Sequence, residues 1–453
     1  MKAGPSTAGG RSRLRAWNWL AAAALAVVAV IAADAWLATP DSVESQDPLD
    51  PAAIQPGFGP ATFVAAMAAR DAAVAAARAR RAAHPDEWLR MEVLARALAG
   101  RHRLTGDAAD LAEADRLLDR ALALAPWPAG PALTAAEVSL SLHDLDGAEH
   151  ALARFDASAV PAPADEQDAA RSIRCEVAFE RGDLPRAQQL CSGADVASLL
   201  RRANLAAKSG DLAGAVGIVE AQLRQPRQAP FTLATLALQR ASLALATGVW
   251  GASGRWARAA ERVFPGYWLS EAYVAQQFAL EGDRTAALRR YRELAERTGD
   301  PDVLDALARL AEADGRASDA RHWAAQAGAA WQERARLLPM TYAAHHSEHL
   351  LLHDNPRGAV TLAQADYGRR PYPGTIVHYA YALWRSGDPA RALAVVRRGQ
   401  ARGFLTAEMK LVEAISLASL GRAAEAGTAL AEARKLNPNI DSQRQQFVTF
   451  GRD

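Results

Sequence analysis

The sequence predicts an all-α fold, and three observations carry that prediction. Half of the residues are hydrophobic, but alanine supplies much of that share, and aromatic residues make up only 6%. Runs of β-branched residues are scarce, so the composition favours closely packed helices over sheets. Glycines also recur at intervals near 34 residues, with apolar residues at helical spacing around them. A chain of 453 residues has room for an extended array of such units.

The amino-terminal residues have the pattern of a membrane segment. Residues 1–15 form a basic tail with one lysine and three arginines, and residues 16–36 are mainly apolar, with Trp17, Trp19 and Trp36 near the ends. This segment is about long enough to cross a bilayer, and its basic flank should stay in the cytoplasm. We therefore predict a transmembrane signal-anchor in the inner membrane, with the rest of the chain in the periplasm.

A cleaved signal peptide is the alternative for the same residues. Ala33, Asp34 and Ala35 form a small-x-small cleavage site directly after the apolar run. Cleavage would leave a soluble periplasmic protein. Under both interpretations the remainder of the chain is exported. Only the uncleaved signal-anchor makes the lipid bilayer a partner.

The next two segments predict a tether and a first helix. Residues 37–60 are rich in proline and aspartate and read as a linker that buries no core. Residues 61–85 are alanine-rich and predict a leading helix. At the other end, residues 441–453 read as a carboxyl-terminal tail.

Between these ends, residues 86–440 predict repeated helical hairpins. Gly387 and Gly421 are 34 residues apart, and each is followed five residues later by an alanine, Ala392 and Ala426. A helix should end at each glycine, and the alanine should open the packing face of a second helix. Earlier turns of this kind are predicted at Gly182, Gly210, Gly254, Gly282 and Gly315. The long interval before Gly254 and the short one after it predict one irregular or merged unit.

Prolines should close the second helices, as Pro126 and Pro438 do. With its period of 34, its hairpin glycine, its second-helix alanine and its closing proline, the sequence resembles the tetratricopeptide repeat family. The resemblance implies about nine or ten hairpins stacked in a right-handed α-solenoid. It also implies an inner groove, lined by the first helix of each hairpin, that binds another protein.

The groove positions that the resemblance implies include a cluster of aromatic and arginine side chains, which commonly dominate interfaces. The full set is Gln276, Asp305, Arg309, Glu312, Glu348, Tyr381, Trp384 and Arg385. Alternatively, Tyr381 and Trp384 pack between adjacent hairpins.

Two further groups of residues are candidate sites. Cys175 and Cys191 lie on either side of one predicted turn, and in an exported protein they either pair as a disulfide or stay as buried thiols. His345, His349 and His353 recur at four-residue steps, a spacing at which imidazoles bind zinc, copper or nickel, with Glu348 as an added oxygen ligand. The alternative is a polar helix face without metal.

Charge and motifs restrict the function. Basic and acidic residues nearly cancel, 52 against 51, and no basic cluster is interleaved with aromatic residues, so we expect no nucleic-acid binding. No phosphate-binding loop, nucleophile–base pair or other catalytic motif appears, so we expect no enzyme activity and no cofactor. The prediction is a scaffold that recruits or organises envelope proteins. The alternatives are a metal-handling accessory protein and an enzyme with an unrecognised site near residues 248–268.

Overall fold

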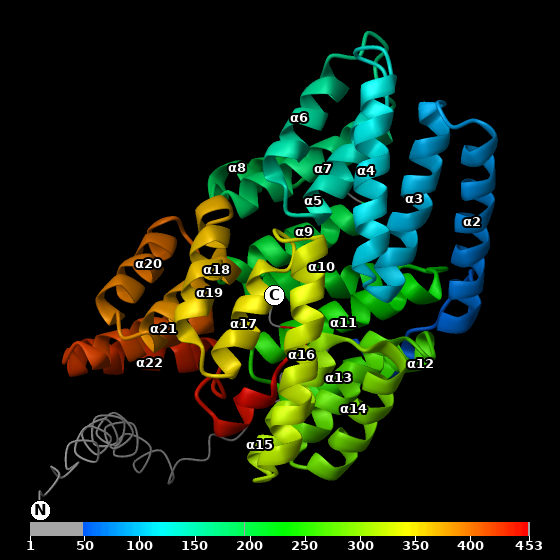
Figure 1. Ribbon diagram of the computed structural model, residues 1–453. Coiled ribbons are helices and arrows are strands. Elements are labelled where there is room, and N and C mark those ends of the chain that lie inside the picture. The colour runs from blue at the N-terminus through cyan, green and yellow to red at the C-terminus, as the bar shows by residue number, and fades with distance from the viewer. Residues whose placement is uncertain (1–48, 194, 452–453) are drawn as a thin grey trace, which may run out of the picture.

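The computed structural model describes residues 49–193 and 195–451, and within them every regular element is a helix (Figure 1). The leading helix α2 (Phe63–Ala83) precedes ten helical hairpins. The first helices are α3 (Trp88–Thr105), α5 (Ala132–Ser141), α7 (Ala164–Glu180), α9 (Val196–Lys208), α11 (Pro230–Ala246), α13 (Trp268–Glu281), α15 (Pro301–Ala313), α17 (Ala343–Leu352), α19 (Pro373–Arg385) and α21 (Ala407–Ser419). The second helices are α4 (Ala108–Leu124), α6 (Leu145–Asp156), α8 (Leu184–Leu190), α10 (Leu212–Leu223), α12 (Trp250–Val263), α14 (Arg284–Thr298), α16 (Ala317–Leu337), α18 (Pro356–Arg369), α20 (Pro389–Ala401) and α22 (Ala423–Leu436). The predicted all-α array of hairpins is confirmed for the described residues.

A glycine followed by an aspartate makes the turn in several hairpins. At Gly387, φ is +90°, a left-handed conformation that costs glycine little and that ends the first helix. Asp388 then caps the second helix, because its side chain accepts a hydrogen bond of 3.1 Å from the backbone N–H of Arg391. The same pair forms the turns at residues 182–183, 210–211 and 282–283.

The structure corrects one predicted turn. Gly254 lies inside α12 and packs against Gln277, whereas the hairpin turn is at Gly248, where φ is +74°. The other turns have an alanine five residues after the glycine, but Gly248 is followed at that position by Ser253. The turn at Gly248 therefore did not match the pattern. Since α11 and α12 form an ordinary hairpin, the predicted irregular or merged unit is wrong.

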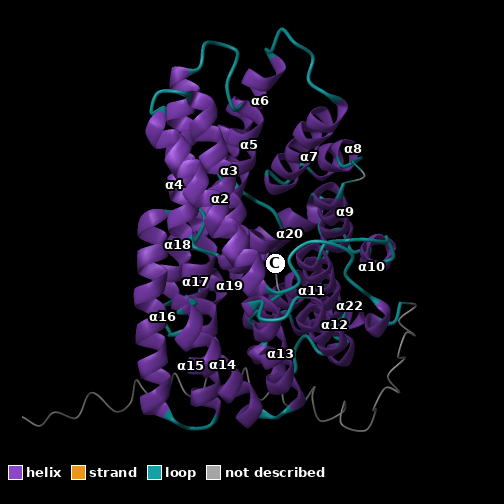
Figure 2. Ribbon diagram, turned by 90° about the vertical axis from the view of Figure 1, so that its right-hand side faces the viewer, coloured by secondary structure: helices purple, strands orange, loops and turns teal. Residues whose placement is uncertain are grey.

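The array coils tightly, so hairpins that are far apart in the sequence pack together. The indole N–H of Trp268 donates a hydrogen bond of 3.0 Å to the carbonyl of Leu104. The hydroxyl of Thr341 donates one of 3.2 Å to the carbonyl of Leu142, across 199 residues of sequence. The side-chain amide of Asn437, directly after α22, donates one of 3.2 Å to the carbonyl of Leu245 in α11. Figure 2 shows that loops alone connect the helices of the described chain. Successive turns of the superhelix therefore contact each other directly.

Part of the predicted linker lies within the described residues 49–60 and packs on the array. The 3-10 helix η1 (Pro51–Ala53) lies against α12, and Arg262 donates a hydrogen bond of 2.6 Å to the carbonyl of Pro51. Ile54 is buried in the main hydrophobic core. The linker prediction is wrong for these residues, because the segment adds to a core built by the hairpins although it has no core of its own.

The predicted tail also packs on the array, and residues 441–451 are called the C-terminal segment below. It contains the 3-10 helix η2 (Gln443–Phe447), and the side chains of Phe447, Val448 and Phe450 are buried in the main core. The carboxamide of Gln276 accepts hydrogen bonds from the N–H groups of Thr449 and Phe450, at 2.6 and 2.8 Å. The segment thus lies along the inner side of α13 and α15.

Within the described residues, no helix is both long and apolar enough to cross a membrane. The predicted membrane segment, residues 16–36, and the basic tail, residues 1–15, lie outside the described residues.

Candidate functional site

A pocket of about 730 Å³ opens beside the C-terminal segment. The first helices α15, α17, α19 and α21 contribute residues to one side of it, and residues 440–446 contribute to the other. Five predicted groove residues line the pocket: Arg309, Glu312, Glu348, Tyr381 and Arg385. The structure therefore brings most of the predicted set to one concave surface.

The other three predicted groove residues lie outside the pocket lining. Gln276 is buried and holds the C-terminal segment, so it is not available to a partner. Asp305 is also buried. The indole N–H of Trp384 donates a hydrogen bond of 2.9 Å to the hydroxyl of Ser419, which places this side chain between α19 and α21.

The pocket wall is charged on one part and apolar on another. Arg385 pairs with Asp354 at 3.0 Å and its guanidinium lies 6.0 Å from the ring centre of Tyr381. Arg309 is turned toward the C-terminal segment and donates a hydrogen bond of 2.6 Å to the carbonyl of Gln446. The apolar part consists of leucine, valine and isoleucine side chains: Leu351, Leu352, Val377, Leu411, Val412 and Ile440.

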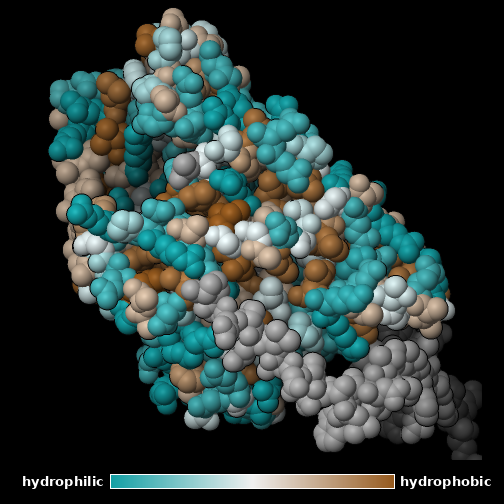
Figure 3. Space-filling model, turned by 180° about the vertical axis from the view of Figure 1, so that it is seen from behind, coloured by the Kyte–Doolittle hydropathy of each residue, from teal (hydrophilic) through white to brown (hydrophobic). Residues whose placement is uncertain are grey.

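Seen from behind, the protein shows several separate hydrophobic areas with hydrophilic areas between them (Figure 3).

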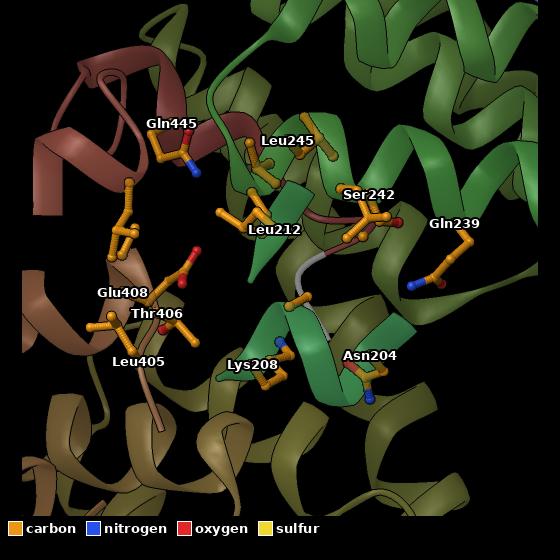
Figure 4. Close-up of a pocket in the computed structure, with 17 residues that line it drawn as sticks. Asn204, Lys208, Leu212, Gln239, Ser242, Leu245, Leu405, Thr406, Glu408 and Gln445 are labelled. Carbon is orange, nitrogen blue, oxygen red and sulfur yellow. The ribbon is translucent and has the colours of Figure 1, made fainter. Parts of the chain in front are cut away.

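A smaller cavity of about 60 Å³ adjoins this pocket (Figure 4). Lys208, Thr406, Glu408 and Gln445 line both spaces. Figure 4 shows that these side chains come from α9, from the start of α21 and from the C-terminal segment. The cavity has room for a few water molecules and not for a peptide.

The three predicted histidines do not gather at one point. Four residues of helix turn about 40° beyond a full circle, so residues at i, i+4 and i+8 drift around the helix. His345 stacks on Trp331, with ring centres 5.4 Å apart and planes at 8°. His349 and His353 turn instead toward Asp305.

Asp305 joins the last two histidines. Its Oδ1 atom accepts hydrogen bonds from Nδ1 of His349 at 2.8 Å and from Nε2 of His353 at 3.1 Å. Its Oδ2 atom accepts one of 2.9 Å from the indole of Trp331. Burial alone would raise the pKa of Asp305, but the hydrogen bonds from His349, His353 and Trp331 outweigh it and lower that pKa to about 2. Asp305 is therefore an ionised, buried carboxylate.

Sequence reasoning missed this role of Asp305 because it lies 44 residues before His349 in another hairpin. The predicted oxygen ligand, Glu348, pairs with Arg309 at 3.2 Å and lies 4.0 Å from His378. The sequence showed only that Asp305 is an acidic residue on a predicted first helix. Many hairpins have such a residue, so this feature did not single out Asp305.

Cys175 in α7 and Cys191 at the end of α8 form a disulfide, with α-carbons 5.3 Å apart. The bond joins the two helices of one hairpin. Since α8 has only seven residues, the disulfide fixes a short second helix that has little packing surface of its own.

No protein-family model matches the chain, and no curated protein matches it. Solved structures that are similar to it include a tetratricopeptide repeat protein from Parabacteroides merdae, with 13% identity over 58% of this chain and 100% of that chain, and a TM-score of 0.35. Yeast Tom70 matches with 12% identity over 84% of this chain and 91% of its own, at a TM-score of 0.35. The tetratricopeptide repeat domain of P58(IPK) matches with 14% identity over 82% of this chain and 89% of its own, at a TM-score of 0.27. At such values they carry no argument about function.

Proposed function

We propose that this protein is a non-catalytic scaffold that binds a partner protein in the pocket beside the C-terminal segment. The observation that carries the proposal is the lining of that pocket, where Tyr381 and Arg385 stand at the edge of a concave, partly apolar wall. Tyrosine and arginine bury large areas at small entropic cost and are frequent anchors of interfaces. A pocket of about 730 Å³ has the size for a few side chains of a peptide segment.

The chemistry of the wall suggests the chemistry of the partner segment. Arg385 and Lys208 are basic, whereas Glu312 and Glu408 are acidic, and apolar side chains lie beside them. A segment with an apolar residue flanked by charges of both signs would complement this wall. We expect it to belong to a protein of the cell envelope.

We also place the solenoid in the periplasm, tethered to the inner membrane by residues 16–36 or released from it by cleavage. The basic tail and the apolar run of the sequence support this location. The disulfide between Cys175 and Cys191 supports it as well, because such bonds persist in oxidising compartments.

Site-specific photo-crosslinking in intact cells tests the scaffold. A photoreactive phenylalanine derivative replaces Tyr381 in the full-length protein, and the control carries it at Val160, which is 75% exposed and outside the pocket lining. We expect a defined envelope protein to be crosslinked from position 381 and not from position 160. Equal capture at both positions, or none at 381, would reject the pocket as the binding site.

The purified partner then tests the role of single side chains. Arg385→Ala should weaken binding by at least tenfold and leave the melting temperature unchanged, because Arg385 pairs with an aspartate that is 91% exposed. Unchanged affinity would remove Arg385 from the interface. Protease added before and after the outer membrane is opened tests the location, since only opened cells should lose a periplasmic solenoid.

A further inference from the structure

We propose that Asp305, His349 and His353 form a binding site for one divalent transition-metal ion, with zinc as the reference ion. The site goes beyond the proposed scaffold function and does not depend on it. Each residue offers one donor atom, and the three atoms all lie within 4.8 Å of one another. They come from two hairpins, since Asp305 is on α15 and the two histidines are at the end of α17.

The donor spacing suits a tetrahedral ion. Zinc–nitrogen and zinc–oxygen bonds of about 2.1 Å place neighbouring donors about 3.4 Å apart. Oδ1 of Asp305 lies 2.8 Å from Nδ1 of His349 and 3.1 Å from Nε2 of His353. Two of the three donor separations are therefore within about 0.6 Å of this value, and the third, between the two imidazole nitrogens, is at most 4.8 Å. Binding would replace the two hydrogen bonds, and each neutral imidazole would then carry its proton on the ring nitrogen that does not bind the ion.

The carboxylate is already oriented for this role. Trp331 holds Oδ2 of Asp305 at 2.9 Å, which leaves Oδ1 directed at both histidines. Such outer hydrogen bonds fix ligand geometry in metal sites. The side chains of Asp305 and His349 are only 4% and 8% exposed, so the surrounding helices limit their movement.

An ion can reach the site from the pocket. The side chain of His353 is 27% exposed and belongs to the pocket lining. Three protein ligands with a fourth position left for water or another donor is the arrangement of accessible zinc sites. Two imidazoles and one carboxylate also disfavour calcium and magnesium, which prefer oxygen ligands.

Metal binding to the untagged full-length protein tests the proposal. The chain is treated with a chelator, dialysed and titrated with Zn²⁺ in a calorimeter, and Co²⁺ is used in parallel for its visible absorption. We expect one ion per chain for both metals, and no binding of Mg²⁺ under the same conditions. The absence of a one-to-one Zn²⁺ complex would overturn the proposal.

A matched pair of variants on one helix distinguishes a site from scattered surface histidines. His353→Ala should weaken Zn²⁺ binding by at least a hundredfold, whereas His345→Ala should change it less than threefold, because His345 stacks on Trp331 and is not a proposed ligand. Equal losses in both variants would assign the binding to the helix face as a whole and reject the site.

Two conservative variants guard against misfolding as an explanation. Asp305→Asn keeps the size of the buried side chain and should abolish binding of the ion. Trp331→Phe keeps an aromatic ring but removes the indole N–H together with part of the ring system, and should weaken Zn²⁺ binding about 10–100-fold. Circular dichroism of each variant checks that the helices are intact. A folded Asp305→Asn variant with undiminished affinity would contradict the proposed ligand set.

Discussion

Buried charged side chains join two turns of the superhelix at the contact between α7 and the end of α18. Arg370 is 1% exposed, yet it makes two hydrogen bonds with Asp366, at 2.9 and 2.8 Å, and lies 3.4 Å from Glu180. A buried pair of this kind adds little net stability, but removal of one partner leaves an unpaired buried charge and costs about 3–5 kcal/mol. The cluster therefore fixes which hairpins meet more than it strengthens their contact.

Glu176 on α7 makes stability depend on pH. Burial, together with the nearby charge of Glu180, raises its pKa to about 7, although Arg201 lies 3.3 Å away. In the unfolded chain a glutamate ionises near pH 4.3. From about pH 4 to 7 the folded state therefore holds a proton that the unfolded state has lost. Stability should fall as pH rises across this range, by up to about 1.4 kcal/mol per pH unit.

Glu176→Gln removes this titration and keeps a similar size. We expect the melting temperature of the variant, relative to the parent, to rise steadily from pH 5 to pH 7 and to level off above it. Thermal melts followed by circular dichroism at several pH values measure the difference. Parallel curves for the two proteins would show that Glu176 keeps an ordinary ionisation in the folded state.

At the scale of the helical hairpin, most of the structure follows from short-range sequence signals. A glycine supplies the left-handed residue and the aspartate after it supplies the cap, so both requirements lie within a few residues of each other. The failed turn at Gly254 shows the limit of this rule, because Gly248 lacks the alanine that marks the other turns. Contacts between hairpins leave no such local mark, which is why the partnership of Asp305 with His349 was not predicted.

Two hairpin glycines with nearly equal backbone angles separate local strain from long-range contact. Gly248 has φ of +74° and Gly421 has φ of +75°. A β-carbon at residue 248 would lie 2.3 Å from Oδ1 of Asn437, whereas one at residue 421 would meet nothing within 4 Å. Both alanine substitutions should cost about 1–2 kcal/mol from the left-handed conformation.

Gly248→Ala should cost about 1–3 kcal/mol more, because it displaces Asn437 from its hydrogen bond to the carbonyl of Leu245. Chemical denaturation of the two variants measures the difference in the free energy of unfolding. Equal losses would mean that the loop after α22 moves aside without cost.

At the scale of the whole molecule, the array is more compact than a simple stack of neighbours. Hydrogen bonds join residues 164 to 211 positions apart, and both ends of the described chain lie against the middle hairpins. The sequence did not predict that these two ends would pack on the hairpins. Considered alone, residues 49–60 resemble a linker and residues 441–451 resemble a tail. Their order comes from a surface that only the assembled hairpins provide.

Phe450→Ala tests whether the C-terminal segment is part of the core. Phe450 is 6% exposed and lies beside the rings of Tyr273 and Tyr291, so its loss should cost about 3–5 kcal/mol. Phe58→Ala is the matched control, because Phe58 is 69% exposed and its loss should change stability by less than about 0.5 kcal/mol. Thermal melts of both variants measure the loss of stability. A small loss for Phe450→Ala would show that the C-terminal segment is a loosely held tail and not part of the core.

The hold of Gln276 on the backbone of Thr449 and Phe450 also constrains how the protein is made. These partners are 173 and 174 residues later in the chain, so they leave the ribosome after every hairpin has been synthesised. The helices α13 and α15 are synthesised earlier, and the carboxamide of Gln276 lacks these two partners until residues 449 and 450 have followed. A nascent chain that stops before residue 441 carries all ten described hairpins but lacks the contacts that residues 441–451 make with α13 and α15.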